Sequence, residues 1–176
     1  DPSLEPLWTV AEQLDQPVLV HPYAPQVGFR LQRYNLSQAV GNPMDTTIAA
    51  GSLVFGGVAD RHPNLKIILV HGGGFFPYQI GRFQRVYEVT PEARAHAQQP
   101  PLDYLRWFYY DTMLLFAPAV RYLAETVGGE RVLLGSDYPF DVGDSDPVRV
   151  VREARLDATT ERQVLSDTCC GLFRLA

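Results

Sequence analysis

The feature that most constrains the fold is the alternation of four short apolar runs with helical stretches. The runs cover residues 16–21, 66–71, 107–112 and 131–137, and each is almost continuously apolar or aromatic. Runs of this kind are typical of strands buried on both faces, as in a parallel sheet. Helical periodicity fills the intervals, at residues 4–14, 45–61, 76–89, 117–127, 146–156 and 159–175. The pattern predicts an α/β fold with parallel strands.

Two helix boundaries can be predicted from local residues. The pair Gly128-Gly129 is a suitable C-terminal cap for the helix at 117–127. Thr160, which stands just before Glu161, is a suitable start for the last helical segment.

Length, charge and cysteine content limit the class of protein. The 176 residues suffice for one domain, and we predict a single domain over 1–176. A net charge of −5 gives no basic surface for nucleic acid or anionic lipid, and no apolar run approaches the roughly 20 residues that span a bilayer. The only cysteines, Cys169 and Cys170, are adjacent and lack zinc-site spacing. We expect them to be reduced thiols in a cytoplasmic protein.

Polar residues capable of metal binding or catalysis end the predicted strands. His21, His71 and Asp137 each end one of them, and Asp111 lies near the end of the remaining one. Parallel strands of a barrel present their carboxyl ends on one face, where barrel enzymes build their active sites. Imidazole and carboxylate together suit zinc, manganese or iron. We therefore expect a shared site, although a lone histidine at a strand end is more often a hydrogen-bonded structural residue.

Three glycines, at 72–74, follow His71 directly. Glycine allows a sharp turn from strand to helix and leaves room for a substrate beside the imidazole. A tight turn without any ligand would need the same residues. The His-Gly-Gly-Gly stretch also occurs in lipases as an oxyanion-hole motif, but the Gly-x-Ser-x-Gly elbow that this chemistry requires is missing from the sequence.

The segments "VHP", "VHGGGFFPYQIGR" and "LLGSDYPF", in this order and spacing, resemble the amidohydrolase superfamily. The likeness is to its amidohydrolase-related branch, which includes the aminocarboxymuconate-semialdehyde decarboxylase-like enzymes. The resemblance implies a metal-dependent (β/α)8 TIM barrel, of which this chain would be the C-terminal half, strands five to eight. The family's first strand carries a His-x-His pair, and this sequence has none. We therefore expect the N-terminal half to be absent from residues 1–176.

The same resemblance implies roles for four residues. His21 and Asp137 match metal ligands, and Asp137 could also exchange a proton. His71 matches a catalytic histidine that acts as general acid or base. Arg82 matches an arginine that binds a substrate carboxylate, in some members across a dimer interface, so a homodimer is expected. The cofactor would be one divalent metal ion, with zinc favoured and manganese possible.

Three functions remain open from the sequence. The first is a metal-dependent decarboxylase of an aromatic or unsaturated carboxylic acid, favoured by the arginine in "HGGGFFPYQIGR". The second is a metal-dependent hydrolase of a lactone, amide or ester, which would use the same site. The third is a non-catalytic barrel fragment that assembles with another chain, because four strands leave two open edges. In each enzymatic case the chain would be incomplete for activity.

The other candidate residues have simpler interpretations. His62 and His96 are expected to be exposed to solvent. Asp111 could either support the site or cap the following helix. The aromatic residues at 108–110 are expected to lie in the strand core.

Overall fold

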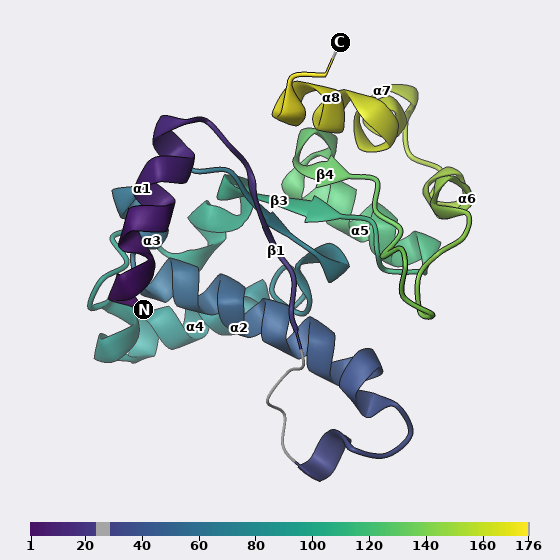
Figure 1. Cartoon of the computed structure of the whole chain (residues 1–176). Coiled ribbons are helices and arrows are strands. Elements are labelled where there is room, and N and C mark those ends of the chain that lie inside the picture. The colour runs from purple at the N-terminus through teal and green to yellow at the C-terminus, as the bar shows by residue number, and fades with distance from the viewer. Residues whose placement is uncertain (24–28, 176) are drawn as a thin grey trace.

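The structure, a computed structural model, describes residues 1–23 and 29–175. Its centre is a parallel sheet of four strands in the order β1-β2-β3-β4 (Figure 1). The strands are β1 (Val18–Val20), β2 (Ile67–Leu69), β3 (Phe108–Asp111) and β4 (Val132–Leu133). The predicted parallel α/β arrangement is therefore confirmed. The strands are shorter than the apolar runs, and the difference is largest for β4, which leaves the sheet well before Asp137.

Helices occupy all the intervals in which the sequence predicts them. They are α1 (Glu5–Gln13), α2 (Asn42–Phe55), α3 (Val58–Arg61), α4 (Ile80–Val89), α5 (Ala117–Val127), α6 (Pro147–Glu153), α7 (Ala158–Arg162) and α8 (Thr168–Phe173). Within residues 1–23 and 29–175 no helix has the length and apolar character needed to cross a membrane.

Helix boundaries follow local capping chemistry. Gly128, with φ of 93°, ends α5 as predicted. The predicted start at Thr160 is wrong, because the Asp157 side chain accepts the N–H groups of Thr159 and Thr160 and so begins α7 earlier. Helix α4 starts at Ile80 instead of Phe76, after turns through residues 74–79.

One face of the sheet forms the main hydrophobic core. Strand residues Phe108 and Tyr110 are fully buried, as predicted for the aromatic run. They belong to the same cluster as residues of β2, β4, α2 and α5, which include Ile67, Leu69, Val132, Ala50, Val54, Leu123 and Val127. This packing fixes α2 and α5 against the strands, and so fixes the loops that follow them.

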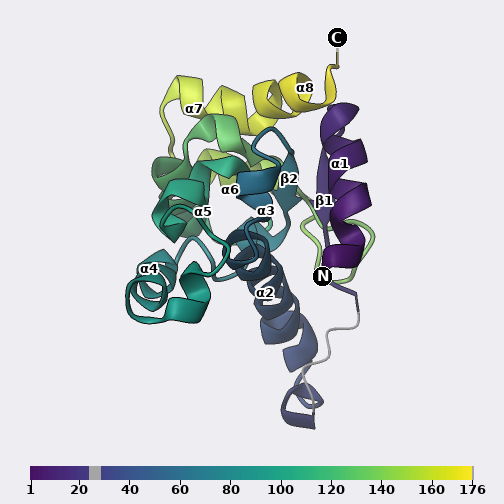
Figure 2. The same ribbon diagram turned by 90° about the vertical axis from the view of Figure 1, so that its left-hand side faces the viewer.

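The opposite face of the sheet is only partly covered. Parallel register aligns Leu19 with Ile68, and Ile68 with Tyr109. Leu172 of α8 packs in one cluster with Ile68 and Leu133, whereas Leu19 on the edge strand is 58% exposed. Figures 1 and 2 both place α7 and α8 at the end of the sheet opposite the first turns of α2. Helices α7 and α8 therefore do not cover the carboxyl ends of the strands, where the polar residues follow.

His62 is a correction to the sequence analysis. It is only 7% exposed, and its Nδ1 and Nε2 atoms lie 3.1 Å from Glu12 Oε2 and Glu5 Oε1. Both carboxylates belong to α1, which packs over the loop before β2. Burial with two acidic partners explains why a histidine in a polar stretch is not solvated. His96 is exposed, as predicted.

Candidate metal and catalytic site

Each of the four strands delivers one ionisable residue to the same end of the sheet. His21 immediately follows β1, and His71 lies two residues after β2. Asp111 is the last residue of β3, and Asp137 lies on the loop that follows β4. Parallel strands require this convergence, because their carboxyl ends share one edge.

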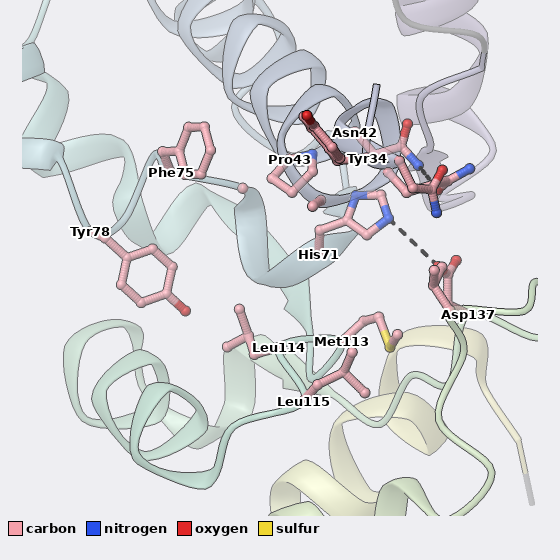
Figure 3. A pocket seen from close by; sticks show the side chains of 15 residues that line it. Tyr34, Asn42, Pro43, His71, Phe75, Tyr78, Met113, Leu114, Leu115 and Asp137 are labelled. Carbon is pink, nitrogen blue, oxygen red and sulfur yellow. Dashed lines mark hydrogen bonds and ion pairs between the residues drawn. The ribbon is translucent and has the colours of Figure 1, made fainter. Parts of the chain in front are cut away.

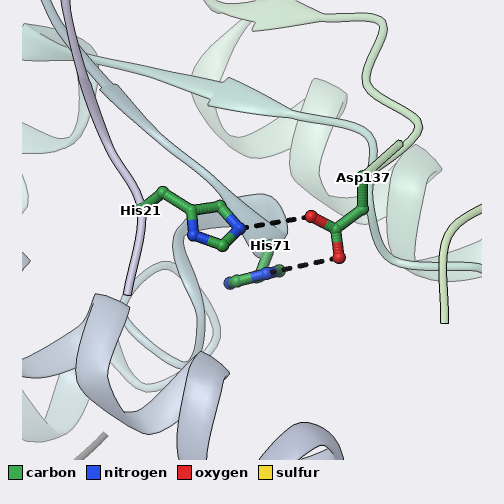
Figure 4. Close-up of side chains that lie close together, drawn as sticks. All are labelled: His21, His71 and Asp137. Atoms are coloured by element: carbon green, nitrogen blue, oxygen red, sulfur yellow. Dashed lines mark hydrogen bonds and ion pairs between the residues drawn. The ribbon is translucent and has the colours of Figure 1, made fainter. Parts of the chain in front are cut away.

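The imidazoles of His21 and His71 meet the carboxylate of Asp137 (Figure 4). His21 Nε2 lies 3.2 Å from Asp137 Oδ1, and His71 Nε2 lies 3.9 Å from Asp137 Oδ2. One ligand atom from each residue lies within 4.8 Å of the other two. Strands β1 and β4 are the two edges of the sheet, and in a flat sheet they would be about 14 Å apart. Their contact therefore requires a strongly curved sheet.

Hydrogen bonds at the far side of each imidazole define its tautomer. His21 Nδ1 lies 2.7 Å from the Pro22 carbonyl oxygen, which can only accept, so Nδ1 carries the proton. His71 Nδ1 lies 3.2 Å from Thr46 Oγ1, and that hydroxyl already donates to the Asn42 carbonyl. His71 Nδ1 is therefore also a donor. Both Nε2 atoms then present lone pairs toward Asp137.

This arrangement fits a cation. An Nε2 lone pair and a carboxylate oxygen separated by 3.2 Å are two acceptors that face one another. A cation between them, either a proton or a metal ion, removes the repulsion. Two imidazoles and one carboxylate form a donor set suited to zinc or manganese.

The backbone around His71 explains the three glycines. His71, Gly72, Gly73 and Gly74 have φ values of 57°, 58°, 78° and 62°, so four successive residues have positive φ. A Cβ atom on Gly74 would lie 2.1 Å from the Pro43 carbonyl oxygen. The turn thus leaves no space for a side chain at Gly74. Asp137 also has a positive φ, 56°, so both His71 and Asp137 adopt conformations that non-glycine residues rarely use.

Asp111 supports the site and does not cap the next helix. Its Oδ1 accepts the N–H groups of Gly72 at 2.8 Å and Met113 at 3.1 Å. Helix α5 begins at Ala117, after Phe116, so Asp111 lies too early to cap it. Burial raises the pKa of Asp111 to about 6, although hydrogen bonds from the backbone oppose the shift.

A cavity of about 640 Å³ opens beside the three residues, with His71 and Asp137 in its wall (Figure 3). Aromatic and aliphatic side chains line much of it, among them Phe75, Tyr78, Met113, Leu114 and Leu115. Asn42, Gln38 and Tyr34 supply polar groups. The lining that the structure describes contains no lysine or arginine. A second hollow of about 350 Å³ adjoins His21 and Phe140, whose rings stack at 5.6 Å.

Burial also affects the protonation of His71. Desolvation lowers the pKa of His71, and the nearby His21 adds to this effect, whereas Asp137 opposes it. The neutral imidazole is therefore favoured near neutral pH. A neutral imidazole with an Nε2 lone pair toward the cavity can accept a proton and return it.

Arg82 lies away from this site. It is exposed on α4 and lines neither hollow. The structure thus brings together His21, His71 and Asp137, and leaves Arg82 outside. Sequence reasoning missed Thr46, Asn42, Tyr78 and Phe140. Tyr78 and Phe140 lie within two of the quoted segments, but their side chains carry no charge or ligand group that would mark them as site residues. Thr46 and Asn42 resemble ordinary helix residues.

Comparison with known proteins agrees with this geometry. The amidohydrolase family (Amidohydro_2) matches residues 1–175. The chain belongs to the amidohydrolase family. A 2-amino-3-carboxymuconate-6-semialdehyde decarboxylase from Dictyostelium discoideum is 34% identical over 94% of this amidohydrolase chain and 46% of its own length. The enzyme of the same name from Caenorhabditis elegans is 32% identical, over 89% of this chain and 39% of its own.

Solved structures define how much of the fold is present. The 5-carboxyvanillate decarboxylase of Sphingomonas paucimobilis matches with a TM-score of 0.89 and 26% identity, over all of this chain and 54% of its own. This amidohydrolase chain spans about half the length of the relatives it matches. Its four parallel strands are accordingly half of a (β/α)8 barrel, and the predicted fold class is confirmed.

Proposed function

We propose that this chain supplies the catalytic half of a metal-dependent decarboxylase of aromatic or unsaturated carboxylic acids. The observation that carries the proposal is the convergence of His21, His71 and Asp137 beside a largely apolar cavity. The relatives named above decarboxylate an aminocarboxymuconate semialdehyde or a carboxyvanillate, which are an unsaturated and an aromatic acid. We further propose that residues 1–176 form one structural unit that another four strands complete.

His21 and Asp137 would hold one divalent ion, through His21 Nε2 and an Asp137 carboxylate oxygen. The remaining ligands would come from residues outside 1–176. Zinc is favoured by the imidazole-carboxylate donor set, and manganese is the alternative. When bound, such an ion polarises substrate oxygens and lowers the pKa of water.

His71 would handle the proton that decarboxylation requires. Loss of carbon dioxide replaces a C–C bond with a C–H bond, so a proton must reach the carbon. The Nε2 atom of His71 faces Asp137 and the cavity, while Thr46 holds Nδ1. A fixed imidazole with its proton-exchanging atom toward the cavity suits delivery of that proton.

The cavity suits a small ring or a conjugated chain. Its volume of about 640 Å³ lies within the usual range for small-molecule sites, and its wall combines flat aromatic groups with a few amides. Because no cationic side chain lines the described wall, a substrate carboxylate needs a charge from elsewhere. The metal ion and an arginine from another subunit are the two sources that we propose.

Arg82 is the arginine that we propose for this role. It is exposed on α4, and no ion pair in the described part of the chain involves it. We propose a homodimer in which α4 carries Arg82 to the partner's cavity. We also retain a cytoplasmic location as a proposal, because the two thiols on α8 are unpaired.

The test uses the complete protein, which is residues 1–176 together with the four strands that we propose to complete them. The protein is loaded with zinc or manganese and supplied with a set of aromatic and muconate-type carboxylic acids, and the carbon dioxide released is measured. We expect His21→Ala to lose the metal, and His71→Ala to keep it while turnover falls about 10²- to 10⁴-fold. Turnover of neutral esters or lactones alone would favour a hydrolase. Absence of any turnover in the metal-loaded protein would favour a non-catalytic barrel segment.

A matched pair of variants tests the arginine. Arg82→Ala should impair turnover of carboxylic acids, because the substrate carboxylate loses its charged partner. Arg85→Ala removes a neighbouring arginine of α4 that is paired with Glu88 at 3.1 Å, and should leave turnover unchanged. Equal activity of the two variants would remove Arg82 from the proposed site.

A further inference from the structure

We infer that Asp111 is a positioning residue for His71, which it holds through the backbone of the glycine turn and not through the imidazole. The expected change in kcat rests on the proposed function. The claim that Asp111 holds the backbone of His71 in place does not depend on that function.

The contacts place Asp111 at the base of the turn. Its Oδ1 accepts the N–H of Gly72, the residue directly after His71, at 2.8 Å. The same oxygen accepts the N–H of Met113 at 3.1 Å, which fixes the carboxylate relative to its own strand. The last pair in the β2–β3 register is Leu69 with Tyr110. Asp111 therefore joins the two chain segments just beyond the point where their backbone ladder ends.

The turn needs such an anchor because glycine does not hold a conformation by itself. Residues 71–74 all have positive φ, and three of them are glycines, which populate many backbone states with similar ease. Within the turn, the N–H groups of Gly73 and Gly74 donate to the Val70 and His71 carbonyls at 3.1 and 2.9 Å. The N–H of Gly72, the peptide N–H that follows His71, donates to the Asp111 carboxylate instead. A charge-assisted bond of this kind is stronger than a neutral one.

His71 is thus fixed at two points. Thr46 holds the Nδ1 side of the imidazole at 3.2 Å, and Asp111 holds the backbone from which the imidazole projects. Loss of the backbone anchor lets the Cα–Cβ bond of His71 turn away, and this movement also carries Nδ1 away from Thr46. Misplacement of a reacting group by about 1 Å can reduce turnover about 10²-fold.

The partners of Asp111 favour this role over a simple ion pair. No ion pair in the described residues involves Asp111, and its donors are backbone N–H groups. The carboxylate faces the same side of the sheet as Leu133, its register partner on β4. It therefore lies directly under the site, between the strand that leads to His71 and the strand that leads to Asp137.

The experiment compares Asp111→Asn and Asp111→Ala with Tyr104→Phe in the complete protein. Tyr104→Phe removes a buried hydroxyl that donates to Asp60 at 2.7 Å, so it lowers stability far from the turn. We expect kcat to fall about 10²-fold in Asp111→Ala and less in Asp111→Asn, which keeps one acceptor. KM and metal content should change less than about threefold, well short of the loss in kcat. Tyr104→Phe should keep its kcat.

A second readout does not depend on activity. In ¹⁵N-labelled protein, the Nδ1–H resonance of His71 should be protected by Thr46 in the wild type and in Tyr104→Phe. We expect Asp111→Ala to lose this protection. Unchanged protection in Asp111→Ala overturns the inference, whatever the turnover. Lost protection in a protein that shows no decarboxylation would support the inference and contradict the proposed function instead.

Discussion

The Nε2 atom of His21 lies 3.2 Å from Oδ1 of Asp137, although the two residues follow opposite edge strands of the sheet. The short distance between these two atoms shows that the four-stranded sheet is strongly curved. It also means that both proposed metal ligands follow edge strands, each of which is paired with a single neighbouring strand. Interactions that fix these two loops should therefore control metal affinity.

Thr112→Val should weaken metal binding, because Thr112 fixes the loop that carries Asp137. Its Oγ1 accepts the Gly135 N–H at 3.1 Å, two residues before Asp137. Loss of an outer partner of this type typically reduces metal affinity about 10–100-fold. Competition with a chelator would measure the change in the complete protein. Thr126→Val, which removes a hydroxyl on α5 that donates to the Tyr122 carbonyl, is the control and should bind metal normally.

Thr46→Val should leave His71 without its acceptor at Nδ1. Thr46 is 1% exposed, so water cannot readily replace the hydroxyl. An unsatisfied buried donor costs about 1–3 kcal/mol, and we expect the free energy of unfolding to fall by that amount. Nitrogen NMR should also show a mixture of His71 tautomers. In the control Thr9→Val, which removes a similar bond to the carbonyl four residues earlier in α1, the His71 spectrum should stay unchanged.

Gly74→Ala and Gly81→Ala should shift stability in opposite directions. At Gly74 the new Cβ would meet a backbone oxygen at 2.1 Å, at a φ of 62° that side chains rarely adopt, so we expect a loss of more than about 1 kcal/mol. Gly81 lies inside α4 with no neighbour within 4 Å of the added methyl group. There the substitution should gain about 0.5–1 kcal/mol of helix propensity. Urea unfolding of both variants measures the contrast.

Glu5→Gln should reveal a pH-dependent part of the stability. Hydrogen bonds from Arg61 and His62 lower the pKa of Glu5 to about 2, from 4.5 in the unfolded chain. A lowered pKa means that ionised Glu5 stabilises the fold above about pH 4.5, and that this contribution is lost as the pH falls toward about 2. The melting temperatures of wild type and variant should therefore differ at pH 7 and converge near pH 2. A constant difference across that range would contradict the pairing.

The architecture was predictable because its signals are local. Continuous apolar runs indicate buried parallel strands, and residues at their ends indicate a shared site. The length of β4 was not predictable, since Leu134 continues the apolar run after the backbone has left the sheet at Leu133. Whether such a run stays in the sheet depends on its neighbours in space.

The environments of individual side chains also depend on neighbours in space that the local sequence does not reveal. The environment of His62 depends on two carboxylates about fifty residues earlier in the chain, which no local pattern reveals. Asp111 was recognisable as a candidate by its position, but its partner Gly72 lies 39 residues away. Thr46 is similar: the sequence shows a threonine in a helix, and only the packing of α2 shows that it faces His71.

The shortness of β4 has a consequence for inactivation by heat. Within the described residues the β3–β4 ladder includes only Val132 and Leu133 of β4, and the segment that carries Asp137 follows them, held to Thr112 through the Gly135 N–H. Segments with few ladder bonds open at lower free energy than the core that they adjoin. Warming should therefore release the Asp137 segment while β2 and β3 are still paired. We expect the bound ion to leave, and turnover to cease, at temperatures where circular dichroism still reports a folded chain.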